Sequence, residues 1–337
     1  MEGGVGDQAA MKKTTFLWID DESERIRDAR NLARSLNIKV IFEDVRNKEL
    51  AEILQHILSG PEPDLVLIDH RLDKVLGGGI IQTGSTTAEV IREKWVECPI
   101  VCVTAVGLKD IALQKKSIYE QVIEHSELTE NYPLLISLAK SFKFLRKKKP
   151  KDVNGLLRLI RVPKADRVRL TAILPEELKR NYDDKSVPIS ISRWVRHTLM
   201  SKPGFLYDQL WAATSLGIKE QSFKKVQDAF VEARYKGIFA DEGNQRWWQT
   251  RIKEILYSKF PADEGQFTWE LGLKLDGVTK QDHSACYVCK KVFPEIVGFT
   301  DETAQTRKPM HLRCSVSHPG FEKALFFEEI RMMKAAE

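Results

Sequence analysis

Acidic and hydroxyl side chains follow three short apolar runs in the first half of the sequence. Asp20 and Asp21 come after "FLWI", Asp69 comes after "LVLI", and Thr104 comes after "VCV". Continuous apolar runs of this length are typical of buried strands in a parallel sheet, whose ligands bind outside the carboxyl ends of the strands. We therefore expect the four side chains to face one crevice. Three converging carboxylates repel unless protons or a cation join them, and an all-oxygen set of ligands suits Mg²⁺.

The elements that must position these residues alternate along the chain. Strand-like segments at 15–20, 39–44, 64–69, 99–105 and 119–125 are separated by amphipathic stretches at 22–37, 48–59 and 86–95. This alternation predicts an α/β fold with a doubly wound, five-stranded parallel sheet. We expect the domain to span residues 13–145, after a disordered N-terminus at 1–12.

Three motifs in this domain carry a family resemblance. The pieces "WIDDE", "LVLIDHRL" and "VCVTA", in that order, resemble the receiver domain of bacterial two-component response regulators, which is flavodoxin-like. The resemblance implies that Asp69 is a phosphoacceptor, that Asp20 and Asp21 hold Mg²⁺ with it, and that Thr104 is the switch hydroxyl. It also implies a histidine kinase or another phosphodonor as partner.

Two features depart from the receiver pattern. The segment after the fifth strand reads "VIEHSELTE", with Glu124, His125 and Ser126 where a receiver has a lysine, and the loop after Asp69 is enlarged to "DKVLGGGIIQTGSTT". Two interpretations stay open. Either Asp69 is phosphorylated, or the domain is a pseudo-receiver that keeps an acidic pocket and switches by binding.

The middle of the chain is basic, whereas the first domain is acidic. Residues 1–142 carry a net charge of −6 and residues 151–280 one of +6. We expect a basic linker and connector at 146–189. At 190–280, three helical patterns and a hairpin pattern predict a winged-helix-like domain. Its candidate nucleic-acid residues are Lys219, Lys224, Lys225, Arg234 and Lys236 on the third helix and Arg246 on the hairpin. Asp228 and Glu232 weaken that basic face, so DNA and a protein partner are both open as targets.

Four residues near the C-terminus have the spacing of zinc ligands. Cys286 and Cys289 form one pair, His311 and Cys314 the other, each with two intervening residues. Such pairs close a tetrahedral Cys₃His site, and four protein ligands indicate structural rather than catalytic Zn²⁺. We expect a zinc-binding module at 281–337, ending in an amphipathic helix that docks on it or forms a homodimer surface.

Composition narrows the class of protein. With no apolar run long enough for a membrane span and no signal-like segment, we expect a cytoplasmic protein. The leading hypothesis is a response-regulator-like signalling protein, with at most autophosphorylation and dephosphorylation at Asp69 as enzymatic activity. One alternative is a scaffold subunit of a multi-protein complex, for example in phage defence. A zinc-scaffolded nuclease is another, although no phosphate-binding loop and no His pair beside the zinc ligands support it.

Overall fold

The computed structural model describes residues 13–76, 84–201, 204–243, 245–263, 266–292, 296–301, 306–311 and 314. The predicted disordered N-terminus and the predicted C-terminal helix lie outside these residues. The chain forms two compact units, one of residues 1–149 with 184–189 and one of residues 150–183 with 190–337. In the described ranges, no helix combines the length and the apolar character that crossing a membrane requires.

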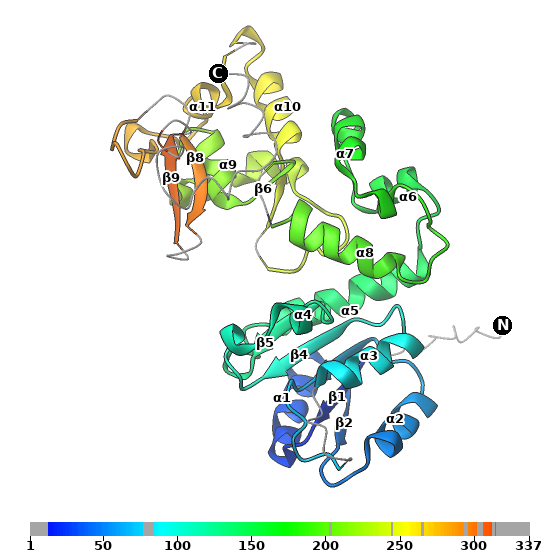
Figure 1. Ribbon diagram of the computed structural model, residues 1–337. Coiled ribbons are helices and arrows are strands. Elements are labelled where there is room, and N and C mark those ends of the chain that lie inside the picture. The colour runs from blue at the N-terminus through cyan, green and yellow to red at the C-terminus, as the bar shows by residue number, and fades with distance from the viewer. Residues whose placement is uncertain are drawn as a thin grey trace, which may run out of the picture. The chain divides into compact units, whose positions relative to one another are not determined.

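The first unit is built on one parallel sheet (Figure 1). Its strands are β1 (Thr15–Asp20), β2 (Lys39–Asp44), β3 (Leu65–Ile68), β4 (Ile100–Thr104) and β5 (Gln121–Glu124), in the order β2-β1-β3-β4-β5. Each neighbouring pair is parallel. This is the flavodoxin-like strand order of a doubly wound sheet. The order in which successive strands are added across the sheet reverses between β1 and β3, while the strands themselves stay parallel. The predicted fold class of this domain is confirmed.

Helices cover both faces of the sheet because its strands are apolar on both sides. The helices are α1 (Ile26–Leu36), α2 (Leu50–Ser59), α3 (Gly84–Lys94), α4 (Leu113–Lys116) and α5 (Tyr132–Lys147). Ile53 of α2 and Ile91 of α3 share one core with Leu17 and Val66 of the strands. The alternate strand positions, including the fully buried Trp18, face the opposite side. There α1 packs against α5. The packing fixes the strand ends on which the acidic residues lie.

The second unit is mostly helical. Its helices are α6 (Val153–Leu159), α7 (Arg167–Ile173), α8 (Val187–Trp194, continued by a π-turn to Leu199), α9 (Gln209–Ser215), α10 (Gln249–Lys259) and α11 (Thr268–Gly272). Two-residue strands β6 (Leu206–Tyr207) and β7 (Trp247–Trp248) pair antiparallel. Strands β8 (Ile296–Asp301) and β9 (Thr306–His311) form a second antiparallel pair.

The region expected to be winged-helix-like differs from the sequence prediction in two elements. The third expected helix consists of two 3₁₀ segments, Glu220–Lys225 and Gln227–Ala233. The second arm of the expected hairpin, β7, pairs with β6 and also forms an antiparallel bridge with Arg234, just before the expected first arm at 237–240. The reason is burial: Trp247 lies edge-on to Phe223 with ring centroids 4.9 Å apart and is 2% exposed. Trp248 is buried as well, at 3% exposed.

Candidate functional site

The three predicted acidic residues come together at the carboxyl edge of the sheet. Asp20 ends β1, Asp21 follows it, and Asp69 follows β3, with one oxygen from each lying within 4.8 Å of the others. Asp20 and Asp21 are 3% and 4% exposed, and Asp69 is half-buried. Thr104 ends β4, the next strand of the sheet, and is also buried. The four positions therefore share one edge, as strand order requires.

Hydrogen bonds hold the Asp20 carboxylate in place. The indole Nε1 of Trp18 donates to Asp20 Oδ2 over 3.2 Å, and the Glu22 N–H donates to Asp20 Oδ1 over 2.8 Å. Two donors leave the remaining lone pairs of this group facing its acidic neighbours, so Asp20 is oriented but not neutralised.

Backbone donors also fix the other two carboxylates. The Lys74 N–H donates to Asp21 Oδ2 over 2.8 Å, which ties the loop after β3 to the loop after β1. The His70 N–H donates to Asp69 Oδ1 over 2.6 Å. Each aspartate is thus held by main-chain groups, and the cluster keeps its shape without a side-chain cation between the carboxylates.

The pKa values of the cluster reflect this crowding. Burial, followed by the charge of Asp20, raises the pKa of Asp69 to about 7. Burial also raises the pKa of Asp20 to about 6, against the hydrogen bonds that lower it. A pKa raised this far means that the ionised cluster is unfavourable without a counter-charge. A hard divalent cation with oxygen ligands fits such a donor set, and Asp20, Asp21 and Asp69 would hold it.

Gly84, the first residue of α3, closes the loop beneath Asp69. Its N–H donates to the His70 carbonyl over 2.8 Å. A Cβ added to Gly84 would lie 1.8 Å from the Asp69 carbonyl oxygen, far inside van der Waals contact. Only glycine permits this approach. The sequence shows a glycine-rich loop after Asp69 but not the role of Gly84, because the contact with Asp69 depends on the position of α3.

The end of β5 carries a polar network where a receiver has a lysine. His125 Nε2 lies 3.2 Å from Asp28 Oδ2, and His125 Nδ1 lies 3.2 Å from Arg25 NH1. Burial, then the charge of Arg25, lowers the pKa of His125. The imidazole is therefore neutral at pH 7 and is engaged with the β1–α1 segment. Among the side chains that the structure describes here, Arg25 is a permanent cation, and its charge lowers the pKa of Asp20.

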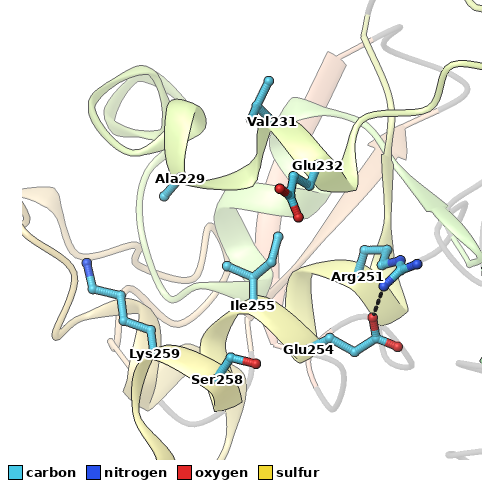
Figure 2. Close-up of a pocket in the computed structure, with 8 residues that line it drawn as sticks. All are labelled: Ala229, Val231, Glu232, Arg251, Glu254, Ile255, Ser258 and Lys259. Carbon is cyan, nitrogen blue, oxygen red and sulfur yellow. Dashed lines mark hydrogen bonds and ion pairs between the residues drawn. The ribbon is translucent and has the colours of Figure 1, made fainter.

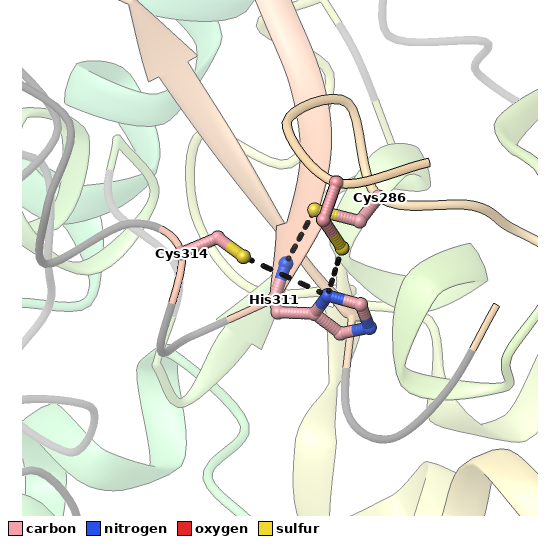
Figure 3. A group of neighbouring side chains, drawn as sticks. Cys286, His311 and Cys314 are labelled. Atoms are coloured by element: carbon pink, nitrogen blue, oxygen red, sulfur yellow. Dashed lines mark hydrogen bonds between the residues drawn. The ribbon is translucent and has the colours of Figure 1, made fainter. Parts of the chain in front are cut away.

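The four predicted zinc ligands also come together. Each residue offers one donor atom, and the four atoms lie within 4.8 Å of one another; the residues are Cys286, Cys289, His311 and Cys314. His311 Nδ1 lies 3.2 Å from Cys289 Sγ and 3.9 Å from Cys314 Sγ, and the His311 N–H donates to Cys286 Sγ over 3.4 Å (Figure 3). Nδ1 is therefore the nitrogen that faces the thiols.

The local fold explains how the thiols converge. The Lys290 N–H donates to the Cys286 carbonyl over 2.9 Å, which closes a tight turn around the first cysteine pair. His311 ends β9 and pairs with Ile296 of β8. Burial raises the pKa of Cys286, but backbone N–H groups that point at its sulfur outweigh burial and lower it. Thiolate-stabilising donors, three sulfurs and one imidazole nitrogen fit Zn²⁺.

Most of the predicted nucleic-acid residues are engaged inside the second unit. Lys219 Nζ donates to the Gln281 carbonyl over 2.7 Å, and Lys225 Nζ lies 2.7 Å from Asp282 Oδ1. Arg234 lies 3.9 Å from Asp228, and Arg246 Nε donates to the Met200 carbonyl over 2.9 Å. In the part of the chain that the structure describes, the exposed Lys224 and Lys236 have no such ion pair or hydrogen bond. Four of the six candidate residues therefore already have partners within the unit.

A groove of about 530 Å³ lies between the second 3₁₀ segment and α10 (Figure 2). It is lined by Ala229, Val231, Glu232, Arg251, Glu254, Ile255, Ser258 and Lys259. The Arg251 and Glu254 side chains pair with each other over 2.7 Å. The groove shares no residue with the acidic cluster or the cysteine cluster.

Comparison with known proteins concerns the first part of the chain. No protein-family model matches the chain, and no curated protein is significantly similar to it. The solved structures that align with it include response regulators. One is the N-terminal domain of a response regulator/sensory box/GGDEF protein from Carboxydothermus hydrogenoformans, at 20% identity and a TM-score of 0.30, over 40% of this chain and 97% of that one.

Two further structures have similar values. The response regulator TrrA from Thermotoga maritima, in complex with Mg²⁺ and BeF, aligns at 21% identity and a TM-score of 0.28 over 36% of this chain and 98% of that one. A two-component response regulator from Clostridium difficile aligns at 18% identity and a TM-score of 0.31 over 38% of this chain and 97% of that one. The fold assignment of the first unit rests on the sheet order described above.

Proposed function

We propose that this chain is a response-regulator-like signalling protein whose input is the acidic pocket of its first unit. The observation that carries the proposal is the position of Asp20, Asp21 and Asp69 within 4.8 Å of one another at the carboxyl edge of the sheet. Their raised pKa values indicate a pocket that gains from a cation. A bound Mg²⁺ would supply charge neutralisation for the carboxylates and for an incoming phosphoryl group.

In the proposed reaction, Asp69 is the nucleophile and phosphoacceptor. One of its carboxylate oxygens attacks the phosphorus of a phosphodonor, such as a phosphohistidine of a kinase. The bond from phosphorus to the leaving group breaks, and the leaving group keeps the electron pair. Thr104, at the end of the neighbouring β4, supplies the switch hydroxyl that would hydrogen-bond the phosphoryl oxygens. In the free protein its Oγ1 accepts from the Val106 N–H over 3.0 Å.

The proposed output lies in the second unit. We infer that modification or cation binding at Asp69 biases a two-state surface of the first unit and so changes how the second unit meets DNA or a protein partner. The role of Cys286, Cys289, His311 and Cys314 is to hold a structural Zn²⁺ that stabilises the β8–β9 hairpin and the cysteine turn.

A second candidate function follows from the network at the end of β5. His125 stands in the segment where a receiver has a lysine, and because it is engaged with Asp28 and Arg25 it is not available to pair with a phosphoryl group. The pocket would then bind a cation and act as a pseudo-receiver within a larger assembly.

Labelling with acetyl phosphate separates the two candidates. We expect Mg²⁺-dependent phosphate incorporation, measured by intact mass, that Asp69→Asn abolishes. Asp73→Asn is the matched control, because Asp73 is an exposed carboxylate in the same loop. Absence of labelling in a protein whose stability still rises with Mg²⁺ would favour the pseudo-receiver.

A further inference from the structure

The turn between the first two cysteines carries apolar side chains on the surface of the second unit. Tyr287 is 43% exposed, Val288 42% and Val292 40%. The Tyr287 N–H donates to the Pro309 carbonyl over 2.7 Å, which anchors this turn to β9. The three side chains are therefore presented on a rigid, cross-linked segment rather than on a free loop, although none of them donates to the metal cluster.

Two lysines from separate segments gather at the same ring. Lys290 Nζ lies 4.5 Å from the Tyr287 ring centroid, and Lys308 Nζ of β9 lies 4.0 Å from it. Lys291, next in sequence, is exposed. The negative face of the aromatic ring attracts both ammonium groups. Both lysine side chains therefore place their charges beside the same ring.

Lys290, Lys291 and Lys308 lie in two short segments of the described chain that contain no acidic residue. The ranges 284–292 and 306–311 contain three lysines and one arginine and no aspartate or glutamate. This contrasts with the predicted basic face, where Lys225 already pairs with Asp282. The tyrosine turn, defined as Tyr287, Val288, Lys290, Lys291, Val292 and Lys308, therefore combines three lysines with an exposed aromatic ring.

We propose that the tyrosine turn binds single-stranded nucleic acid, with Lys290 and Lys308 on successive phosphates and a base stacked on Tyr287. Cation–π contacts at exposed sites are weak. Phosphates can therefore draw the two ammonium groups away from the Tyr287 ring, which leaves its face open to a base. Stacking needs an unpaired base, which favours a single strand over a duplex. Exposed valines beside the ring extend the apolar contact. An acidic peptide would use the lysines alone and leave the ring without a role.

This inference rests on the proposed output role of the second unit and is independent of chemistry at Asp69. The test uses the full-length, zinc-loaded protein and a fluorescent oligothymidylate, with binding followed by anisotropy at several salt concentrations. We expect Tyr287→Ala to weaken binding about tenfold and Tyr287→Phe to restore it, because the phenyl ring still stacks. Replacing both Lys290 and Lys308 by glutamine is expected to lower the salt slope by about 1.4, since each phosphate contact contributes about 0.7.

Lys236→Gln is the matched control, because Lys236 is an exposed lysine of the same unit that lies outside the tyrosine turn. Zinc content, measured for every variant, shows that the cysteine turn is intact. The proposal is overturned if the protein does not bind the oligonucleotide at low salt, or if Tyr287→Ala and the double glutamine variant bind as wild type does. It is also overturned if polyglutamate displaces the labelled oligonucleotide as effectively as unlabelled oligonucleotide does, and Tyr287→Ala changes the affinity for neither polymer. Phosphate labelling of Asp69 is read separately, so either proposal can fail alone.

Discussion

Asp69 is the residue whose replacement gives the most informative stability measurement. Its pKa is about 7 in the folded protein and 3.8 in an unfolded chain. For a carboxyl whose folded pKa is raised, the contribution to stability is fully present below pH 3.8 and is lost as the pH rises through 7. At 1.36 kcal/mol per pKa unit, the wild-type protein without Mg²⁺ loses about 4 kcal/mol between those limits.

Asp69→Asn removes this loss because the amide does not ionise and its oxygen can still accept from the His70 N–H. We expect the variant to match wild type near pH 4 and to exceed it by up to about 4 kcal/mol at pH 8. Scanning calorimetry without added Mg²⁺ and without chelator, which would also strip zinc, measures the difference. The unfolding transition of the first unit is recognised as the one that Mg²⁺ stabilises in the wild-type protein. At a Mg²⁺ concentration a hundred times the dissociation constant, its free energy of unfolding rises by about 2.7 kcal/mol.

Asp44→Asn is the matched control, at the end of the neighbouring strand β2. The side-chain hydrogen bond from Arg46 lowers the pKa of Asp44, so its contribution to stability changes with pH in the opposite direction to that of Asp69. This exposed pair contributes at most about 1 kcal/mol, lost as the pH falls. If Asp69→Asn and wild type melt in parallel from pH 5 to pH 8, the carboxylates are not crowded as described and the cation argument fails.

Three further predictions concern single contacts. Gly84→Ala places a methyl group against the Asp69 carbonyl and is expected to lower the stability of the first unit by about 1–3 kcal/mol, measured by thermal melting. Cys286→Ser removes a buried thiolate and is expected to reduce the zinc bound per chain, measured by atomic emission. Arg92→Met removes the cation that lies 2.7 Å from the fully buried carboxylate of Glu120 and is expected to cost about 3–5 kcal/mol in urea unfolding.

Each of these variants has a partner that should behave as wild type. Gly60→Ala is expected to cost much less than Gly84→Ala, because an added Cβ would meet only the Ile57 carbonyl oxygen, at 3.3 Å, and φ is −79°. Cys98→Ala keeps its zinc because Cys98 lies in the core of the first unit. Arg251→Met breaks only a surface pair with Glu254. If a variant and its control lose the same stability, or the same amount of bound zinc, the contact on which that prediction is based does not have the stated effect.

The acidic pocket was predictable from sequence because its signal is local. A buried strand is a continuous apolar run, and the residue that ends it lies at the carboxyl edge whatever the details of packing. Asp20, Asp69 and Thr104 follow from that rule alone. The zinc ligands were predictable for the same reason, because two short pairs fix their own turns.

Interactions between distant segments were not predictable in this way. The charge of Lys225 counts toward a basic face until Asp282, 57 residues later, is found 2.7 Å from it. The hairpin prediction missed the register, because the pairing of Trp247 with Tyr207 and with Arg234 depends on a core that no local pattern describes. The missing lysine was visible in the sequence, but the engagement of His125 with Arg25 required α1 and β5 to be placed together.

The indole of Trp18 gives the pocket an optical reporter of its own. Its ring is fully buried and its Nε1–H donates directly to Asp20, so the dipole of the excited indole lies beside the carboxylate whose charge changes. Protonation of Asp20 and cation binding should each shift the emission of this tryptophan, and Trp18→Phe identifies its share of the spectrum. Occupancy of the pocket can then be followed in the intact protein without a label.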